Sequence, residues 1–210
     1  MTNEIDRKQA RGKVIVVSGP SGVGKSTIVR EVCRRADDVD LSVSLTTRKP
    51  GPDEQDGRDY RFISEPEFRE RIEQGLLLEY AEVFGNLYGT PKDKVDEALA
   101  AGRSVILEID VQGGRQAKAA YPDAVMIFIL PPDEKALAER LDRRGRDTAD
   151  VTEKRLDGAS NEIAAAWQSY DNMVINEDLE HAIGEVIQII EQALRGEETA
   201  PEPDERIGDE

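Results

Sequence analysis

The stretch VIVVSGPSGVGKS, residues 14–26, decides the fold. Residues 14–18 are a short, mostly β-branched run that predicts a buried strand, and residues 26–35 have helical periodicity. Between them, residues 19–26 satisfy the pattern G-x-x-x-x-G-K-[ST] at every fixed position. A strand, a glycine-rich turn and a helix in this order make half of a βαβ unit, so the sequence predicts an α/β protein.

The glycine-rich turn has the chemistry of a phosphate site. Glycines let consecutive backbone N–H groups point at phosphate oxygens, and the helix N-terminus adds partial positive charge. Lys25 can reach the β- and γ-phosphates of ATP or GTP, and the Ser26 hydroxyl can ligate Mg²⁺. A glycine-rich turn that binds nothing is the alternative, and the motif does not say what happens to the nucleotide. The residues predicted to bind ATP here are Gly19, Pro20, Ser21, Gly22, Val23, Gly24, Lys25, Ser26 and Thr27.

The rest of the chain continues the alternation of strands and helices. Residues 104–110 and 124–130 are unbroken apolar runs, which are typical of strands buried on both faces of a parallel sheet. Further strands are expected at 59–64, 76–83, 87–89 and 173–176, and helices at 66–74, 92–101, 133–143, 152–169 and 179–194. The pattern predicts a three-layer α/β fold with a parallel central sheet.

Length and composition favour one acidic domain. The chain has 210 residues, 38% hydrophobic and 34% charged, and no apolar run long enough to span a bilayer. The formal net charge of -16 argues against a duplex nucleic acid partner, because phosphate contacts need a basic surface. Residues 1–11 lack the apolar segment of a secretory signal, which favours a cytoplasmic location. Cys33 and His181 are assigned no role.

Further motifs resemble the guanylate kinases in order and spacing. They are SLTTRKP (44–50), DGRDYRF (56–62), EYA (79–81), YGTP (88–91), EIDVQG (108–113), Arg140, Arg144, Arg155 and VIN (174–176). The resemblance runs from about Gly12 to Leu194 and implies the P-loop NTPase fold. We therefore expect a kinase-like domain at 12–194 after a flexible N-terminus at 1–11. The acidic, proline-containing composition of residues 195–210 predicts a disordered tail. Within the domain the resemblance implies a GMP-binding insertion at about 44–99 and a short arginine-rich lid at about 139–158.

The resemblance also implies the acceptor site. Ser44, Arg48, Tyr60 and Tyr88 correspond to residues that bind the GMP phosphate, and an arginine fork suits a phosphate. Guanine has two N–H donors on its N1/N2 edge, and Glu79 and Asp110 match the family's acceptor positions. Thr90 could donate to guanine O6. Taken singly, each carboxylate is more typical of a surface or a helix cap.

The arginine-rich stretch from Arg140 to Arg146 resembles the family's lid over ATP. Arg140 and Arg144 are one helical turn apart and can face the same phosphates, with Arg155 on the next helix. An ordinary salt-bridge network with Glu139 and Asp142 is the alternative. Asn176 matches a position that binds ATP.

One stretch departs from the family pattern. The family has a second phosphate-binding arginine three residues after Arg48, followed two residues later by glycine and glutamate. Here these places hold Gly51, Asp53 and Glu54. We therefore expect weaker GMP binding, unless Lys49, Arg58 or Arg61 replaces the missing charge.

The implied activity is transfer of the γ-phosphoryl group of ATP to GMP, giving ADP and GDP, in purine nucleotide metabolism and GMP recycling. Mg²⁺ is the expected cofactor, and Lys25, Arg48, Arg140, Arg144 and Arg155 the expected catalytic residues. The expected partners are ATP and GMP, without nucleic acid or membrane, for a monomer or homodimer. A phosphopeptide-binding scaffold and a P-loop kinase for a ribosyl bisphosphate remain as alternatives.

Overall fold

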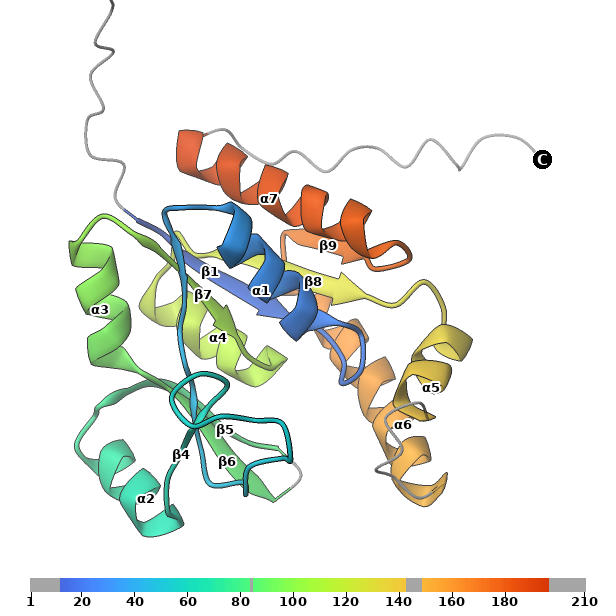
Figure 1. Ribbon diagram of the computed structural model, residues 1–210, viewed down its shortest axis with the longest axis horizontal. Helices are drawn as coiled ribbons and strands as arrows, with labels where there is room; N and C mark the ends of the chain where they lie inside the picture. The colour runs from blue at the N-terminus through green and yellow to red at the C-terminus, as the bar shows by residue number, and fades with distance from the viewer. Residues whose placement is uncertain (1–11, 84, 143–148, 197–210) are drawn as a thin grey trace, which may run out of the picture.

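The computed structural model describes residues 12–83, 85–142 and 149–196, excluding the side chains of 142, 149–155 and 157. The predicted N-terminal segment 1–11, the tail beyond Gly196, and Arg143, Arg144 and Arg146 therefore lie outside the described residues. The described chain is built around one parallel sheet with helices on both faces (Figure 1). The predicted three-layer α/β architecture is confirmed.

The central sheet has five parallel strands in the order β2-β7-β1-β8-β9. These strands are β1 (Val14–Ser18), β2 (Val39–Leu41), β7 (Ser104–Glu108), β8 (Val125–Leu130) and β9 (Asn172–Ile175). β1 is the middle strand, with Val16 in register with Leu107 of β7 and Met126 of β8. Because all five strands point the same way, the loops that follow them meet at one edge of the sheet.

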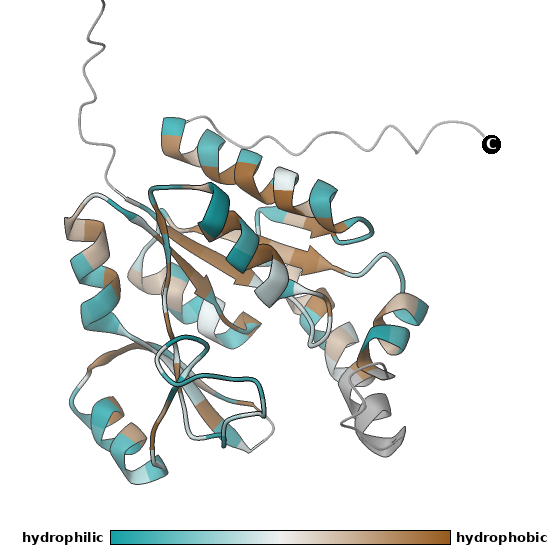
Figure 2. Ribbon diagram, in the orientation of Figure 1, coloured by the Kyte–Doolittle hydropathy of each residue, from teal (hydrophilic) through white to brown (hydrophobic). Residues whose placement is uncertain are grey.

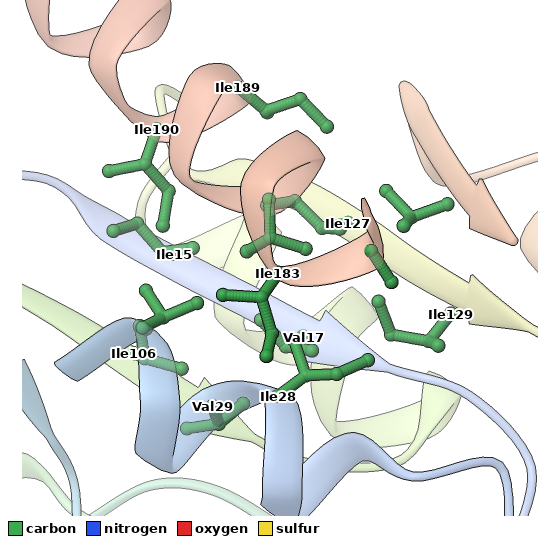
Figure 3. Packing of buried hydrophobic residues seen from close by; sticks show 14 of the residues in the cluster. Ile15, Val17, Ile28, Val29, Ile106, Ile127, Ile129, Ile183, Ile189 and Ile190 are labelled. Atoms are coloured by element: carbon green, nitrogen blue, oxygen red, sulfur yellow. The ribbon is translucent and has the colours of Figure 1, made fainter. Parts of the chain in front are cut away.

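Side chains of β1 alternate between two hydrophobic layers because a strand projects successive residues to opposite faces. Ile15 and Val17 pack with α1 (Lys25–Arg35) and α7 (Leu179–Arg195). Figure 3 shows this layer, with Ile183 of α7 close to β1. Val14 and Val16 face the other way, toward α3 (Lys92–Ala100), α4 (Val111–Ala120) and α6 (Ala149–Ala166). α5 (Glu134–Asp142) packs on α6 through a small apolar cluster.

The helices are amphipathic, and their polar faces turn to solvent. Figure 2 shows apolar strands in the central sheet and mixed helices around it. On α7, Ala182, Ile183, Val186, Ile189 and Ile190 are buried, which is the spacing of one helical face. None of the helices in the described part of the chain is long and apolar enough to cross a membrane.

A second, smaller sheet lies below the central one in Figure 1. It has four strands in the order β4-β3-β6-β5. Their bounds are β3 (Leu45–Thr46), β4 (Arg61–Phe62), β5 (Leu77–Val83) and β6 (Asn86–Pro91), with α2 (Glu65–Glu73) between β4 and β5. The Gln116 amide of α4 donates to Tyr80 O at 2.8 Å and accepts from Tyr80 N at 3.3 Å, which joins this sheet to the central layer.

Three elements were not predicted, and several were predicted to extend beyond their observed bounds, the strand expected at 59–64 most of all. β2 and β3 are too short to show a period, and the glycine pair in α4 hides that helix. The expected strand at 59–64 is reduced to β4. Asp56 and Asp59 accept from Phe62 N and Gln55 N, both at 2.9 Å, and so hold residues 55–60 as a loop.

Candidate active site

The glycine-rich loop connects β1 to α1 at the carboxyl edge of the central sheet, with Ser26 and Thr27 in the first turn of the helix. Gly24 precedes α1 with a φ of 108°, and a Cβ there would lie 2.5 Å from Asn176 Nδ2. Glycine is therefore required at this position. Gly24, the N-cap residue, has no side chain to cap α1, and the partial positive charge of the helix N-terminus favours an anion there.

The back of the loop is tied to two predicted ATP-site residues. Asn176 Nδ2 donates to Val23 O at 2.7 Å, and Arg140 Nη1 donates to the same oxygen at 3.1 Å. Arg140 Nη2 donates to Asn176 O at 2.8 Å. In this structure Arg140 braces the loop, rather than extending its guanidinium toward the ATP phosphates. Lys25 Nζ folds back on the loop and donates to the carbonyls of Gly19 and Pro20.

Ser26 has a carboxylate partner that sequence reasoning missed. Its hydroxyl donates to Glu108 Oε1 at 2.6 Å, across from the end of β7. An acid that ends an apolar strand, as in SVILE at 104–108, is the signal that could have found it. A hydroxyl and a carboxylate oxygen at this spacing are the donors that Mg²⁺ prefers, so the residues fit the cation. Among the described residues, no group of three or more His, Cys, Asp or Glu could hold a metal ion.

Three predicted phosphate-binding residues meet on the smaller sheet. Arg48 Nε donates to the Tyr88 hydroxyl at 3.2 Å, and the Arg48 guanidinium carbon lies 5.4 Å from the Tyr60 ring centre. The Tyr60 and Tyr88 rings are 5.9 Å apart and meet edge to face. Ser44 is buried directly before β3. Tertiary structure thus gathers Arg48, Tyr60 and Tyr88, which are far apart in sequence.

Arg48 also pairs with Glu54, to which sequence reasoning assigned no role. Nη1 and Nη2 of Arg48 donate to the two Glu54 carboxylate oxygens at 2.9 and 2.8 Å. The Glu54 carboxylate raises the pKa of Arg48, and Arg48 lowers the pKa of Glu54. Of the residues considered as replacements for the missing arginine, Arg58 donates to Asp59 and to Asp53 O, and Lys49 and Arg61 are exposed. Replacement of the missing charge by one of them stays a prediction.

The predicted guanine acceptors lie on either side of Gly113. Glu79 is only 3% exposed and accepts from Thr90 Oγ1 at 2.7 Å, while Asp110 caps α4 by accepting from Gly113 N at 2.8 Å. A Cβ at Gly113 would collide with Glu79 Oε2, so glycine is what lets α4 approach this carboxylate. Thr90 has one hydroxyl proton and uses it on Glu79, so in this structure it supports the carboxylate instead of presenting a donor for guanine O6.

Burial makes Glu79 unusual among the acids of the chain. Loss of solvation raises its pKa to about 7, against the lowering effect of the Thr90 hydroxyl. Glu162 of α6 is a second carboxyl whose pKa burial raises, with Lys25 lowering it and Asp110 raising it. Charges of both predicted sites, Lys25 in one and Asp110 in the other, therefore act on Glu162. No sequence motif indicated this residue.

A buried hydroxyl pair links the two sites. Tyr170 Oη donates to Ser18 Oγ at 2.6 Å, and Ser18 Oγ donates to Ile109 O at 2.8 Å. Ser18 directly precedes the glycine-rich loop, and Ile109 directly precedes Asp110. Neither residue was predicted, because a serine at a strand end and a lone tyrosine carry no sequence signal.

Comparisons with known proteins point to the same family as the motifs that form these sites. A model of the family described as "Guanylate kinase" matches residues 11–193. The chain belongs to the guanylate kinase family. The guanylate kinase of Bordetella pertussis is 48% identical over 182 residues, covering 87% of this chain and 84% of the relative. That of Gloeobacter violaceus is 49% identical over 185 residues, covering 88% and 90%. The crystal structure of guanylate kinase from Anaplasma phagocytophilum superimposes with a TM-score of 0.73 at 32% identity, covering 90% of this chain and 88% of that one.

The lid that the resemblance implies at about 139–158 lies only partly within the described residues. Arg140 is described at the end of α5, whereas Arg144 lies outside the described residues. Arg155 lies within α6, but its side chain also falls outside what the structure describes. The phosphate-facing roles of these three arginines remain predictions.

The buried Glu79 predicts a pH-dependent stability difference. Its folded pKa exceeds its usual value of 4.5, so its burial is tolerated when protonated and becomes costly as the pH rises through about 7. At pH 8.5 we expect the free energy of unfolding of Glu79→Gln to exceed that of the unmodified protein by roughly 2–4 kcal/mol, so the variant should unfold at higher urea. Near pH 5 the two proteins should unfold at the same urea concentration.

Urea melts of both proteins at the two pH values measure this difference. Glu82→Gln, an exposed position on the same strand, serves as the matched control and should show no such pH dependence. An equal effect of Glu79→Gln at both pH values would show that Glu79 stays ionised throughout.

Proposed function

We propose that this protein is an ATP:GMP phosphotransferase, which moves the γ-phosphoryl group of ATP to GMP and yields ADP and GDP. The observation that carries the proposal is the buried Glu79 carboxylate, held by Thr90 and approached by Gly113 beside Asp110. A carboxylate is costly to bury unless a ligand donates to it, and guanine supplies two adjacent N–H donors. Membership of the guanylate kinase family supports the same activity.

The donor site is the glycine-rich loop. N–H groups at the start of α1 bind the β-phosphate, and Lys25 turns from the loop carbonyls to the transferred phosphoryl group. Ser26 and Glu108 would hold Mg²⁺, which neutralises charge on the phosphates when bound. Asn176 holds the loop from behind.

The acceptor site binds GMP by its two ends. Arg48, Tyr60 and Tyr88, with Ser44 nearby, bind the phosphate, while Glu79 and Asp110 accept from guanine N1 and N2. Adenine lacks this donor pair, so AMP would leave buried carboxylates without partners. A site of this kind rejects such an analogue strongly.

Transfer needs no nucleophilic side chain. An oxygen of the GMP phosphate attacks the γ-phosphorus, a P–O bond to it forms, and the P–O bond to ADP breaks. Lys25, Arg48 and the lid arginines Arg140, Arg144 and Arg155 act by positioning and by offsetting charge. For Arg140 this role requires that it leave Val23 O when the lid closes over ATP.

We assign the activity to a kinase domain at residues 12–194, with the GMP-binding insertion at about 44–99 and the lid at about 139–158. The smaller sheet, spanning β3 to β6, supports the insertion boundaries. The proposed setting is cytoplasmic purine nucleotide metabolism, as a monomer or homodimer without nucleic acid or membrane partners.

A panel of acceptors tests the activity. With Mg²⁺ and ATP, release of ADP measured by a coupled assay should be fastest with GMP, slower with dGMP, and near background with AMP, UMP and a ribosyl bisphosphate. Lys25→Ala should lower kcat at least ~100-fold, because it removes charge from the transferred group. Equal rates with GMP and AMP would refute guanine recognition. No ADP release with any acceptor would favour a scaffold, and ADP release that needs no acceptor would indicate a hydrolase.

The missing arginine predicts a gain of affinity on restoration. Gly51 lies beside the Arg48–Glu54 pair and has no left-handed φ, so an arginine is compatible with its backbone. We expect Gly51→Arg to lower the KM for GMP about 10- to 150-fold, the effect of a hydrogen bond to a charged group. Steady-state kinetics check this, with Gly51→Gln as an uncharged control of similar reach. An unchanged KM would show that this site has no deficit.

A further inference from the structure

The guanidinium group of Arg48 is almost fully used by the protein itself. It has five N–H donors in one plane. Nε donates to the Tyr88 hydroxyl at 3.2 Å, and Nη1 donates to Lys49 O and to Glu54 Oε2, both at 2.9 Å. Nη2 donates to Glu54 Oε1 at 2.8 Å. Within the described chain, one N–H of Nη2 is left over.

The two partners occupy different edges of the guanidinium plane. Glu54 takes the end formed by Nη1 and Nη2, and Tyr88 lies on the side formed by Nε and Nη2. The remaining N–H of Nη2 points along that second edge, because the group is planar and its hydrogens are fixed. A phosphate can therefore reach Arg48 beside the Tyr88 hydroxyl without displacing Glu54.

Glu54 is itself held in place. Its Oε2 accepts from Gly51 N at 2.6 Å in addition to Arg48 Nη1. The side chains of Arg48 and Glu54 are 29% and 25% exposed, so water competes only partly for the pair. The ring centres of Tyr60 and Phe62 lie 5.4 and 5.9 Å from the guanidinium carbon. The carboxylate on one edge and the two nearby rings restrict the orientation of Arg48.

We infer that Glu54 is a positioning residue for the acceptor, which turns the Nε/Nη2 edge of Arg48 toward the phosphate of GMP. The inference rests on the proposed function and names a residue that acts through Arg48 without touching the substrate. It matters more in this chain because Gly51 supplies no second guanidinium, so the phosphate depends on the orientation of Arg48.

A competing explanation predicts the opposite change in the KM for GMP when the charge of Glu54 is removed. A carboxylate beside a dianionic phosphate repels it, so removing the charge of Glu54 should tighten GMP binding if Glu54 is only a rival anion. If Glu54 positions Arg48, removing its charge should weaken GMP binding, even though the site becomes less negative. The direction of the change in KM separates the two.

Glu54→Gln keeps the shape of the side chain but turns its amide N–H₂ toward the donors of Arg48, so the fork is lost. We expect the KM for GMP to rise about tenfold, with a smaller change in kcat and no change in the KM for ATP. A fall in the KM for GMP, or no change, would overturn the inference.

Asp53→Asn is the matched control, because it removes the same charge one residue away at an exposed position. Its KM for GMP should stay within about twofold of the unmodified protein or fall slightly, as screened surface charges have small effects. An increase equal to that of Glu54→Gln would mean that charge in this loop matters and orientation of Arg48 does not.

Guanosine separates positioning from a general loss of structure. It carries the base but no phosphate, so its inhibition constant should be the same in Glu54→Gln and the unmodified protein. A parallel weakening of guanosine and GMP would refute a role at the phosphate. Absence of GMP phosphorylation by the unmodified protein would instead refute the proposed function, so the two failures are distinguishable.

Discussion

Parallel pairing of β1 with β7 brings the ends of these two strands side by side, and the predicted donor site and Asp110 of the predicted acceptor site lie at that edge. Val17 is in register with Glu108, so the loop after β1 places Ser26 within 2.6 Å of the Glu108 carboxylate. The same pairing puts Ser18 against Ile109 O, directly before Asp110, the residue that caps α4. Donor and acceptor chemistry therefore share one rigid frame, which is what transfer between two bound nucleotides requires.

Charge is distributed unevenly in this acidic chain. Most acids are exposed, but Glu79 is buried at a cost that raises its pKa to about 7. Such a carboxylate lowers stability until a ligand donates to it, which is a common compromise between stability and recognition. The charge of Arg48, in contrast to that of Glu79, is stabilised within the protein, because Glu54 pairs with it before any phosphate binds. Preorganisation of both groups limits the reordering that GMP binding would need.

Glycines, which have no side chain, are required at three close contacts around the site. At Gly24 a Cβ would meet Asn176, at Gly113 it would meet Glu79, and at Gly114 it would meet the Tyr170 hydroxyl. Each glycine lets one element approach another closely: the loop approaches the end of β9 at Gly24, and α4 approaches Glu79 of β5 at Gly113 and Tyr170 at Gly114. Substitution there would separate functional groups without touching them.

The amino-acid sequence alone was enough to predict the α/β class, the strands β1, β7 and β8 and the glycine-rich loop. Its motifs also indicated the family. These are local properties, because apolar runs and the spacing of glycines, Lys25 and Ser26 are visible along the chain. Four hydrogen-bonded pairs became visible only in the folded structure. They are Arg48 with Glu54, Arg140 with Val23 O, Thr90 with Glu79, and Ser26 with Glu108. Side-chain partners 82 or 117 residues apart are set by packing and strand register, which no local pattern encodes.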